Sequence, residues 1–206
     1  MVRILPPLEN GDHLGATEFL RRFEAMHEVK KAELVQGIVF MAAPVRLDFH
    51  ATPDGLIQTW LGTYSAYRAG TTHATNLTVR LGPDDVMQPD AVLILDPAHG
   101  GKTSIDGSGY LAGPPELVVE VAASSVSRDA REKLVSYRRA GVREYVLWRV
   151  IDEVIEWFTL EEDEYRPLAV VDGRIESRIF PGLVLNVPAA LAGDRAIVLE
   201  TLSSVR

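Results

Sequence analysis

The amino-acid sequence predicts an α/β protein in which helices pack on one mixed β-sheet. Residues 88–96 and 117–121 contain near-continuous apolar runs, which are typical of strands buried on both faces of a sheet. Before them, apolar residues recur at helical spacing over 49–67. After them, a helix is expected over 127–140, ended by Gly141. This order of helices and strands favours an α/β sandwich.

Shorter segments complete the predicted core and extend it at both ends. Thr17 is expected to cap a first helix, and 33–41 is expected to form a β-hairpin whose turn is Gln36–Gly37. The remaining expected segments are a strand at 73–81, a long Gly- and Pro-rich loop at 97–115, a strand at 145–148, and antiparallel strands between 153 and 185. From residue 49 the core therefore reads helix, three strands, helix, strand.

The composition excludes several classes of protein. The chain has 206 residues, no Cys, and a formal net charge of -8 from 21 Lys and Arg and 29 Asp and Glu. The missing Cys excludes disulfides, Cys-ligated zinc and thiol nucleophiles. The acidic balance argues against a general binder of the phosphate backbone. We expect a soluble cytoplasmic protein, since no signal-peptide pattern and no apolar run of about 18 residues is found.

Two acidic residues occupy positions where the sequence predicts burial. Asp90 opens one of the apolar strands, and Glu120 lies inside the other. An isolated buried carboxylate costs several kcal/mol unless it is paired, protonated or bound to a metal. Pairing with Arg or capping of a strand is one interpretation. A site for Mg²⁺ or Mn²⁺ is the other, because these ions prefer carboxylate oxygens.

A cation that could serve such a site lies on the following helix. Asp129, Lys133 and Tyr137 are four residues apart and therefore share one helix face. Taken alone, this pattern is more typical of a solvated helix with an Asp–Lys pair. Around it, the charge is uneven: 128–149 has seven Lys and Arg against three Asp and Glu, whereas 152–164 has seven acids and no base. The basic segment is a candidate nucleic-acid docking surface or an ordinary surface helix.

An ordered set of residues resembles a known family. The set is Glu33-Leu34-Val35-Gln36-Gly37, His50, Pro89-Asp90, Glu116-Leu117-Val118-Val119-Glu120-Val121, Asp129 with Lys133 and Tyr137, and Gly141-Val142-Arg143-Glu144-Tyr145. It resembles the Uma-type family of restriction endonucleases, within the PD-(D/E)XK nuclease superfamily. The resemblance runs from about Glu33 to Trp148. It implies a restriction-endonuclease-like mixed sheet flanked by helices, with an N-terminal helix and hairpin and appended C-terminal antiparallel strands.

The resemblance also implies a site. Its catalytic residues would be Asp90, Glu120, Lys133, Glu33 and His50, with Asp90 and Glu120 as metal-binding acids. The carbonyl of Val121 is a further candidate ligand, because backbone oxygens suit Mg²⁺. In the parent motif the Lys follows the second acid after one residue, a place held here by Ala122, and the Uma-type pattern instead places it at Lys133.

The chain departs from the family pattern in two places. Gln36 stands where the family usually has an acidic residue after the Glu33 strand. The family's Ser usually follows the second acid more closely than Ser124 follows Glu120. Two functions therefore stay open. The first is a Mg²⁺- or Mn²⁺-dependent DNA endonuclease, and the second is an inactive or weakly active oligomeric or nucleic-acid-associated module with the nuclease fold.

The domain organisation follows from length and from this resemblance. We expect a single nuclease-like domain over 1–206, with a core at about 33–150, an N-terminal helix at 17–29 and a β extension at 151–187. A homodimer is expected through the C-terminal strands or the N-terminal helix.

Overall fold

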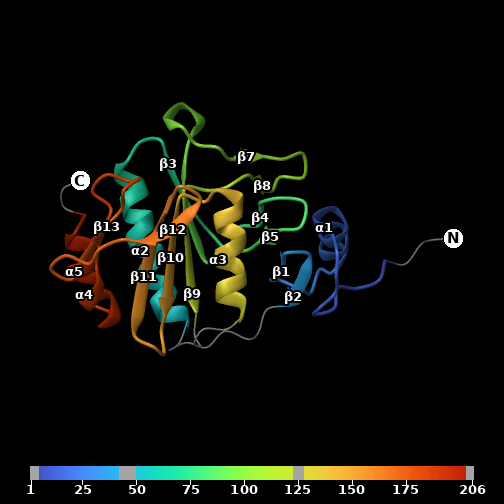
Figure 1. The fold of residues 1–206 in the computed structure, drawn as a ribbon, viewed down its shortest axis with the longest axis horizontal. Helices are drawn as coiled ribbons and strands as arrows, with labels where there is room; N and C mark the ends of the chain where they lie inside the picture. The colour runs from blue at the N-terminus through green and yellow to red at the C-terminus, as the bar shows by residue number, and fades with distance from the viewer. Residues whose placement is uncertain (1–4, 42–49, 123–127, 203–206) are drawn as a thin grey trace.

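A six-stranded mixed sheet forms the centre of the molecule (Figure 1). The computed structural model describes residues 5–41, 50–122 and 128–202, and only the backbone of 128–131. The sheet has the order β12-β11-β10-β9-β6-β3, with β9 and β10 parallel and the other neighbours antiparallel. Its strands are β3 (Thr71–Thr75), β6 (Ala91–Leu95), β9 (Leu117–Ala122), β10 (Glu144–Arg149), β11 (Val154–Glu161) and β12 (Glu164–Pro167).

Two helices cover opposite faces of this sheet, as the sequence predicts. Helix α2 (Thr52–Tyr67) buries Trp60 against one face, in a cluster that includes Val119 of β9. Helix α3 (Arg128–Ala140) buries Tyr137 in the cluster on the other face, which includes Val118. Alternate residues of β9 thus point to different cores, which explains the continuous apolar run. The order α2, β3, β6, β9, α3, β10 confirms the predicted core.

A second six-stranded sheet lies beside the central one and has the order β2-β1-β5-β4-β8-β7. Its strands are β1 (Ala32–Val35), β2 (Ile38–Met41), β4 (Val79–Arg80), β5 (Val86–Met87), β7 (Ser104–Ile105) and β8 (Leu111–Ala112). The predicted hairpin is confirmed as β1 and β2, and both turn residues have positive φ, 51° at Gln36 and 79° at Gly37. Helix α1 (Ala16–Ala25) packs Phe19 and Leu20 against β1 and β2.

Some predicted local details are wrong. The strand expected at 73–81 is divided at Asn76, whose φ is 48°, so that β3 joins the central sheet and β4 joins the second sheet. Asn tolerates this left-handed conformation better than most residues, and the alternating pattern conceals the break. Helix α1 is preceded by Gly15 as N-cap, and Thr17 lies inside the helix. The expected loop at 97–115 contains a 3-10 helix, η2 (Pro97–His99), and the β7–β8 hairpin.

The C-terminal part combines strands with two helices that the sequence pattern did not reveal. Strands β13 (Arg174–Glu176) and β14 (Val184–Asn186) pair with each other, and α4 (Val187–Leu191) and α5 (Arg195–Glu200) follow. These helices lie at the end of the molecule opposite α1 (Figure 1). Buried Glu144 ties this part to the central sheet, since its carboxylate accepts hydrogen bonds from Ser177 Oγ and Trp157 Nε1. No helix in the described ranges has the length and apolar character needed to cross a bilayer.

Candidate active site

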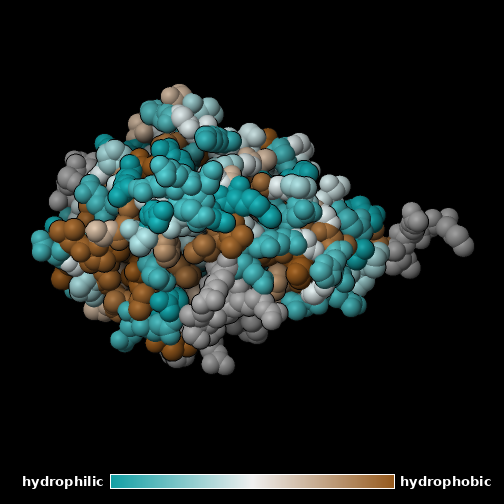
Figure 2. Space-filling model, viewed as in Figure 1, coloured by the Kyte–Doolittle hydropathy of each residue, from teal (hydrophilic) through white to brown (hydrophobic). Residues whose placement is uncertain are grey.

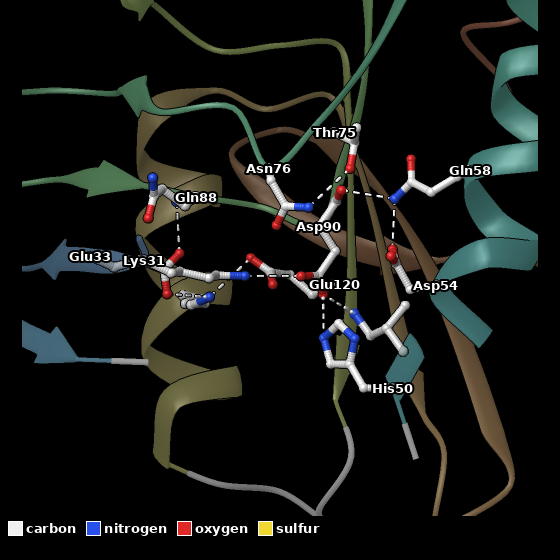
Figure 3. A network of polar contacts seen from close by, with 12 residues as sticks. Lys31, Glu33, His50, Asp54, Gln58, Thr75, Asn76, Gln88, Asp90 and Glu120 are labelled. Carbon is white, nitrogen blue, oxygen red and sulfur yellow. Dashed lines mark hydrogen bonds and ion pairs between the residues drawn. The ribbon is translucent and has the colours of Figure 1, made fainter. Parts of the chain in front are cut away.

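Asp90 and Glu120 lie next to each other on adjacent strands of the central sheet. Asp90 immediately precedes β6, and Glu120 is the fourth residue of β9. The two strands pair with Ala91 opposite Val119, which brings the start of β6 beside the end of β9. Both residues are buried, with exposed fractions of 3% for Asp90 and 7% for Glu120. The predicted juxtaposition of two buried acids is therefore present (Figure 3).

The Asp90 carboxylate, just before β6, accepts a hydrogen bond from the backbone of the neighbouring strand β9. Its Oδ2 accepts the backbone N–H of Val121 at 2.8 Å. In a strand, the N–H and C=O of one residue point to the same side, so the Val121 carbonyl also faces the Asp90 side of β9. The next carbonyl, of Ala122, points the other way, where it accepts the N–H of Val150.

Lys133 links two acids from two different sheets. From α3, its ammonium nitrogen reaches Glu33 Oε2 at 2.6 Å and Glu120 Oε1 at 3.1 Å. Tyr137, one helical turn further on, donates its hydroxyl to the same Glu120 Oε1 at 2.7 Å. The predicted shared face of Lys133 and Tyr137 therefore points at the acids, whereas the side chain of Asp129 lies outside the described part of the chain.

Lys31 is a site residue that the sequence analysis missed. Its ammonium nitrogen lies 3.0 Å from Asp90 Oδ1 (Figure 3). Residues two apart in a strand share a face, so Lys31 and Glu33 both point toward the acids, whereas Ala32 and Leu34 pack in the α1 core. The spacing of two from Glu33 is the signal that identifies Lys31.

His50 stands before α2 and closes the site from a third direction. Its Nε2 lies 3.4 Å from Asp90 Oδ2. This contact raises the pKa of His50, although burial of the ring acts against it. The expected position of His50 near the acids agrees with the structure.

A second group of polar side chains holds the first in place. Gln58 of α2 donates through Nε2 to the Asp90 carbonyl at 2.9 Å and to Asp54 Oδ1 at 2.6 Å, and its Oε1 contacts His73 Nε2 at 2.7 Å. On the other side, Gln88 donates its backbone N–H to Glu33 Oε1 at 2.8 Å. Both oxygens of Glu33 are thus engaged, one by Gln88 and one by Lys133.

The charges of the site are nearly balanced. Three carboxylates, of Asp90, Glu120 and Glu33, face the two ammonium groups of Lys31 and Lys133. Burial by itself lowers the pKa of each lysine, but the surrounding acids outweigh it and leave both pKa values raised.

The two central acids respond to this environment in opposite directions. Burial raises the pKa of Glu120 to about 7, against the opposing attraction of Lys133. Burial would also raise the pKa of Asp90, but the hydrogen bond to His50 and the attraction of Lys31 hold it well below its usual value. Such divergence between neighbouring carboxyls is typical of functional sites.

The donor atoms fit a hard divalent cation. The contacts that other described side chains make with Glu120 go to Oε1, which leaves Oε2 for a further ligand. Asp90 and the Val121 carbonyl face the same region. Within the described ranges no three His, Asp or Glu side chains converge as a ready-made metal cluster. Two carboxylates, one carbonyl and water molecules suit Mg²⁺, which usually retains several waters.

Of the two departures from the family pattern, the structure describes Gln36. Gln36 is in the β1–β2 turn, where its side-chain amide contacts the carbonyl of Glu132. Ser124 lies outside the described residues. The basic segment is partly neutralised by acids from elsewhere in the chain: Arg139 pairs with Asp85 and Arg138 with Glu164. Its use as a docking surface stays a prediction.

The fold and the acid–lysine group together define a restriction-endonuclease-like protein. A family model described as "Uma2: Putative restriction endonuclease" matches residues 16–188. The chain belongs to the Uma2 family.

A solved structure shows the same fold. It is described as "a putative nuclease belonging to DUF820" from Anabaena variabilis, and it is similar with a TM-score of 0.64 and 12% identity. The match covers 84% of this chain and 97% of that one. No curated protein matches this chain.

Proposed function

We propose that the protein is a Mg²⁺- or Mn²⁺-dependent endonuclease that hydrolyses phosphodiester bonds of DNA. One observation carries the proposal: two buried carboxylates, of Asp90 and Glu120, lie side by side on adjacent strands, and a lysine is held between Glu120 and Glu33. Membership of the Uma2 family supports the reaction class. Hydrolysis needs a positioned water, neutralisation of charge at phosphorus and protonation of the leaving oxygen.

Asp90, Glu120 and the Val121 carbonyl would hold the cation. A bound divalent ion would neutralise charge on the phosphate and lower the pKa of a coordinated water. The low pKa of Asp90 supports this role, since Asp90 is anionic over the whole range in which such enzymes work. The Val121 N–H fixes the direction of the Asp90 carboxylate.

Lys133 would orient the attacking water or stabilise the charge that develops on the phosphate oxygens. Glu33, whose two oxygens contact the Gln88 N–H and Lys133, would orient the Lys133 ammonium group. These contacts support a positioning role for Glu33. His50 would contact a phosphate or pass a proton, because an imidazole ordinarily titrates near neutral pH. The contact with Asp90 raises the pKa of His50 and so favours the charged ring that binds a phosphate.

The test is cleavage of supercoiled, linear and single-stranded DNA by the wild type and by Asp90→Ala, with Mg²⁺ or Mn²⁺ and with chelator. We expect cleavage that requires the metal and falls at least about a hundredfold in the variant. Glu176→Ala, at an exposed position of β13, is the control for loss of one acid. A folded wild type that cleaves none of these DNA forms, or equal activity of Asp90→Ala, would refute the proposal.

Metal binding distinguishes the endonuclease from the alternative, an inactive module with the nuclease fold. The lysine contacts of both acids are the observation that favours it, because they compensate the charges without a metal. Calorimetric titration with Mn²⁺ decides: heat of binding that disappears in Glu120→Ala counts against the alternative, and no heat in the wild type counts for it.

We also propose that the protein forms a homodimer through its C-terminal part. Ile151, Val170 and Val171 are more than half exposed, and apolar surface gathers at the end that carries α4 and α5 (Figure 2). Light scattering at micromolar concentration is expected to give the mass of a dimer, and Val171→Asp to shift it toward the monomer. Ile105→Asp, on β7 of the other sheet, should leave the mass unchanged. A monomeric wild type contradicts the proposal.

A further inference from the structure

Lys31 makes a different kind of contact from Lys133. Among the described residues, Lys133 contacts two acids and its side chain is 13% exposed, whereas Lys31 contacts one acid, Asp90, and its side chain is 29% exposed. The chain next to Lys31 is fixed, because the Ala32 N–H donates to Gln88 Oε1 at 3.0 Å. Lys31 therefore combines a fixed neighbouring backbone with a long, flexible and partly exposed side chain.

The ammonium group of Lys31 contacts Oδ1 of Asp90, the carboxylate oxygen that no other described residue contacts. Asp90 Oδ2 accepts the Val121 N–H and faces His50, whereas Oδ1 contacts Lys31 at 3.0 Å. A Mg²⁺ or Mn²⁺ ligand oxygen lies about 2.1 Å from the ion. A divalent cation bound to this carboxylate would thus stand within a few ångströms of the ammonium group, and like charges at that separation repel strongly.

We propose that Lys31 occupies the cation position at Asp90 in the metal-free protein and that a divalent cation displaces its ammonium group, which then binds a substrate phosphate. The first half concerns metal binding alone, and the second half rests on the proposed nuclease function. Lys31 is thus both a competitor of the metal and a phosphate-binding residue. The competition keeps the three buried acids compensated while the metal is absent.

Metal affinity tests the first half directly. Calorimetric titration with Mn²⁺ is expected to show binding about tenfold tighter in Lys31→Met than in the wild type, since the competing charge is removed. Lys31→Arg, which keeps the charge, is expected to bind Mn²⁺ as weakly as the wild type. Lys30→Met is the matched control: Lys30 is exposed and donates to the His27 carbonyl, so removing its charge should leave Mn²⁺ affinity unchanged.

Thermal unfolding of each variant shows that it is folded. Equal or weaker Mn²⁺ binding by a folded Lys31→Met overturns the first half. Tighter binding by both Lys31→Met and Lys30→Met also overturns it, because the effect would then come from general charge. If Lys31→Met does not fold, Lys31→Gln takes its place with the same expected direction.

DNA cleavage at saturating Mn²⁺ tests the second half. Lys31→Met is expected to raise KM for DNA despite its tighter metal binding, and Lys31→Arg to restore KM in part. An unchanged KM overturns the phosphate role. Absence of cleavage by the wild type refutes the nuclease proposal and with it the phosphate role, whereas the Mn²⁺ titration still decides whether Lys31 competes with the metal.

Discussion

Replacing Glu120 by glutamine is expected to lower metal-dependent DNA cleavage by about a thousandfold, because one of the two carboxylates proposed to bind the metal is lost. The same change is expected to leave the protein as stable as the wild type at pH 8, or more stable. Burial raises the pKa of Glu120 to about 7, so the ionised carboxylate is disfavoured in the folded state. Glutamine has nearly the same shape and carries no charge, and Lys133 keeps Glu33 as its partner.

The pH dependence of this effect has a definite sign. The folded protein holds the Glu120 proton up to about pH 7, whereas the unfolded chain releases it near the ordinary glutamate pKa of 4.5. Between these values the folded state binds more protons, so this group makes the wild type less stable as pH rises, by about 3 kcal/mol at most. The variant lacks this loss. Thermal unfolding from pH 5 to pH 8 should therefore show the melting temperature of Glu120→Gln rising relative to that of the wild type.

The matched control for this change is Glu176→Gln, at an exposed position. It should alter neither cleavage nor the pH dependence of unfolding. If Glu120→Gln cleaved DNA as the wild type does, the metal-binding role of Glu120 would be wrong. If the variant lost stability steadily relative to the wild type toward pH 8, the raised pKa would be wrong while the catalytic role could still hold.

Replacing Lys133 by methionine is expected to have the largest effect on stability. Removing one partner of a buried ion pair typically costs about 3–5 kcal/mol, since the other charge is left uncompensated. Here Glu33 and Glu120 both lose their contact with the ammonium group. For a chain of this size the melting temperature should fall by about 10 °C at pH 8. The loss should be smaller at pH 5, where Glu120 is protonated and needs the cation less.

Thermal unfolding of Lys133→Met and Lys102→Met measures this effect. Lys102 is exposed, and its replacement should change the melting temperature little. Cleavage assayed well below the melting temperature of Lys133→Met should also be strongly reduced. Equal melting temperatures of the two variants would show that Lys133 does not compensate the buried acids.

The core and most of the site could be predicted from the sequence for identifiable reasons. Buried strands and amphipathic helices leave strong apolar patterns, and an acid such as Glu120 inside an apolar run stands out because burial of a charge requires a partner. The break at Asn76 left no comparable signal, since its neighbours continue the alternation of a strand. Lys31 was missed because its partner Asp90 is 59 residues away, and exposed and site lysines look alike in a sequence.

The charge-compensating residues come from two separately built layers. Asp90, immediately before β6, and Glu120 of β9 belong to the central sheet. Lys31 immediately precedes β1 and Glu33 lies on it, in the second sheet, whose hairpin packs against α1. If this N-terminal layer separated from the central sheet, Asp90 would lose its contact with Lys31, and Lys133 would lose its contact with Glu33. The electrostatic balance of the site therefore depends on the packing of α1 and the β1–β2 hairpin. A mutation in that small apolar core would act as a change of charge at Asp90 and Glu120, although it alters no charged residue.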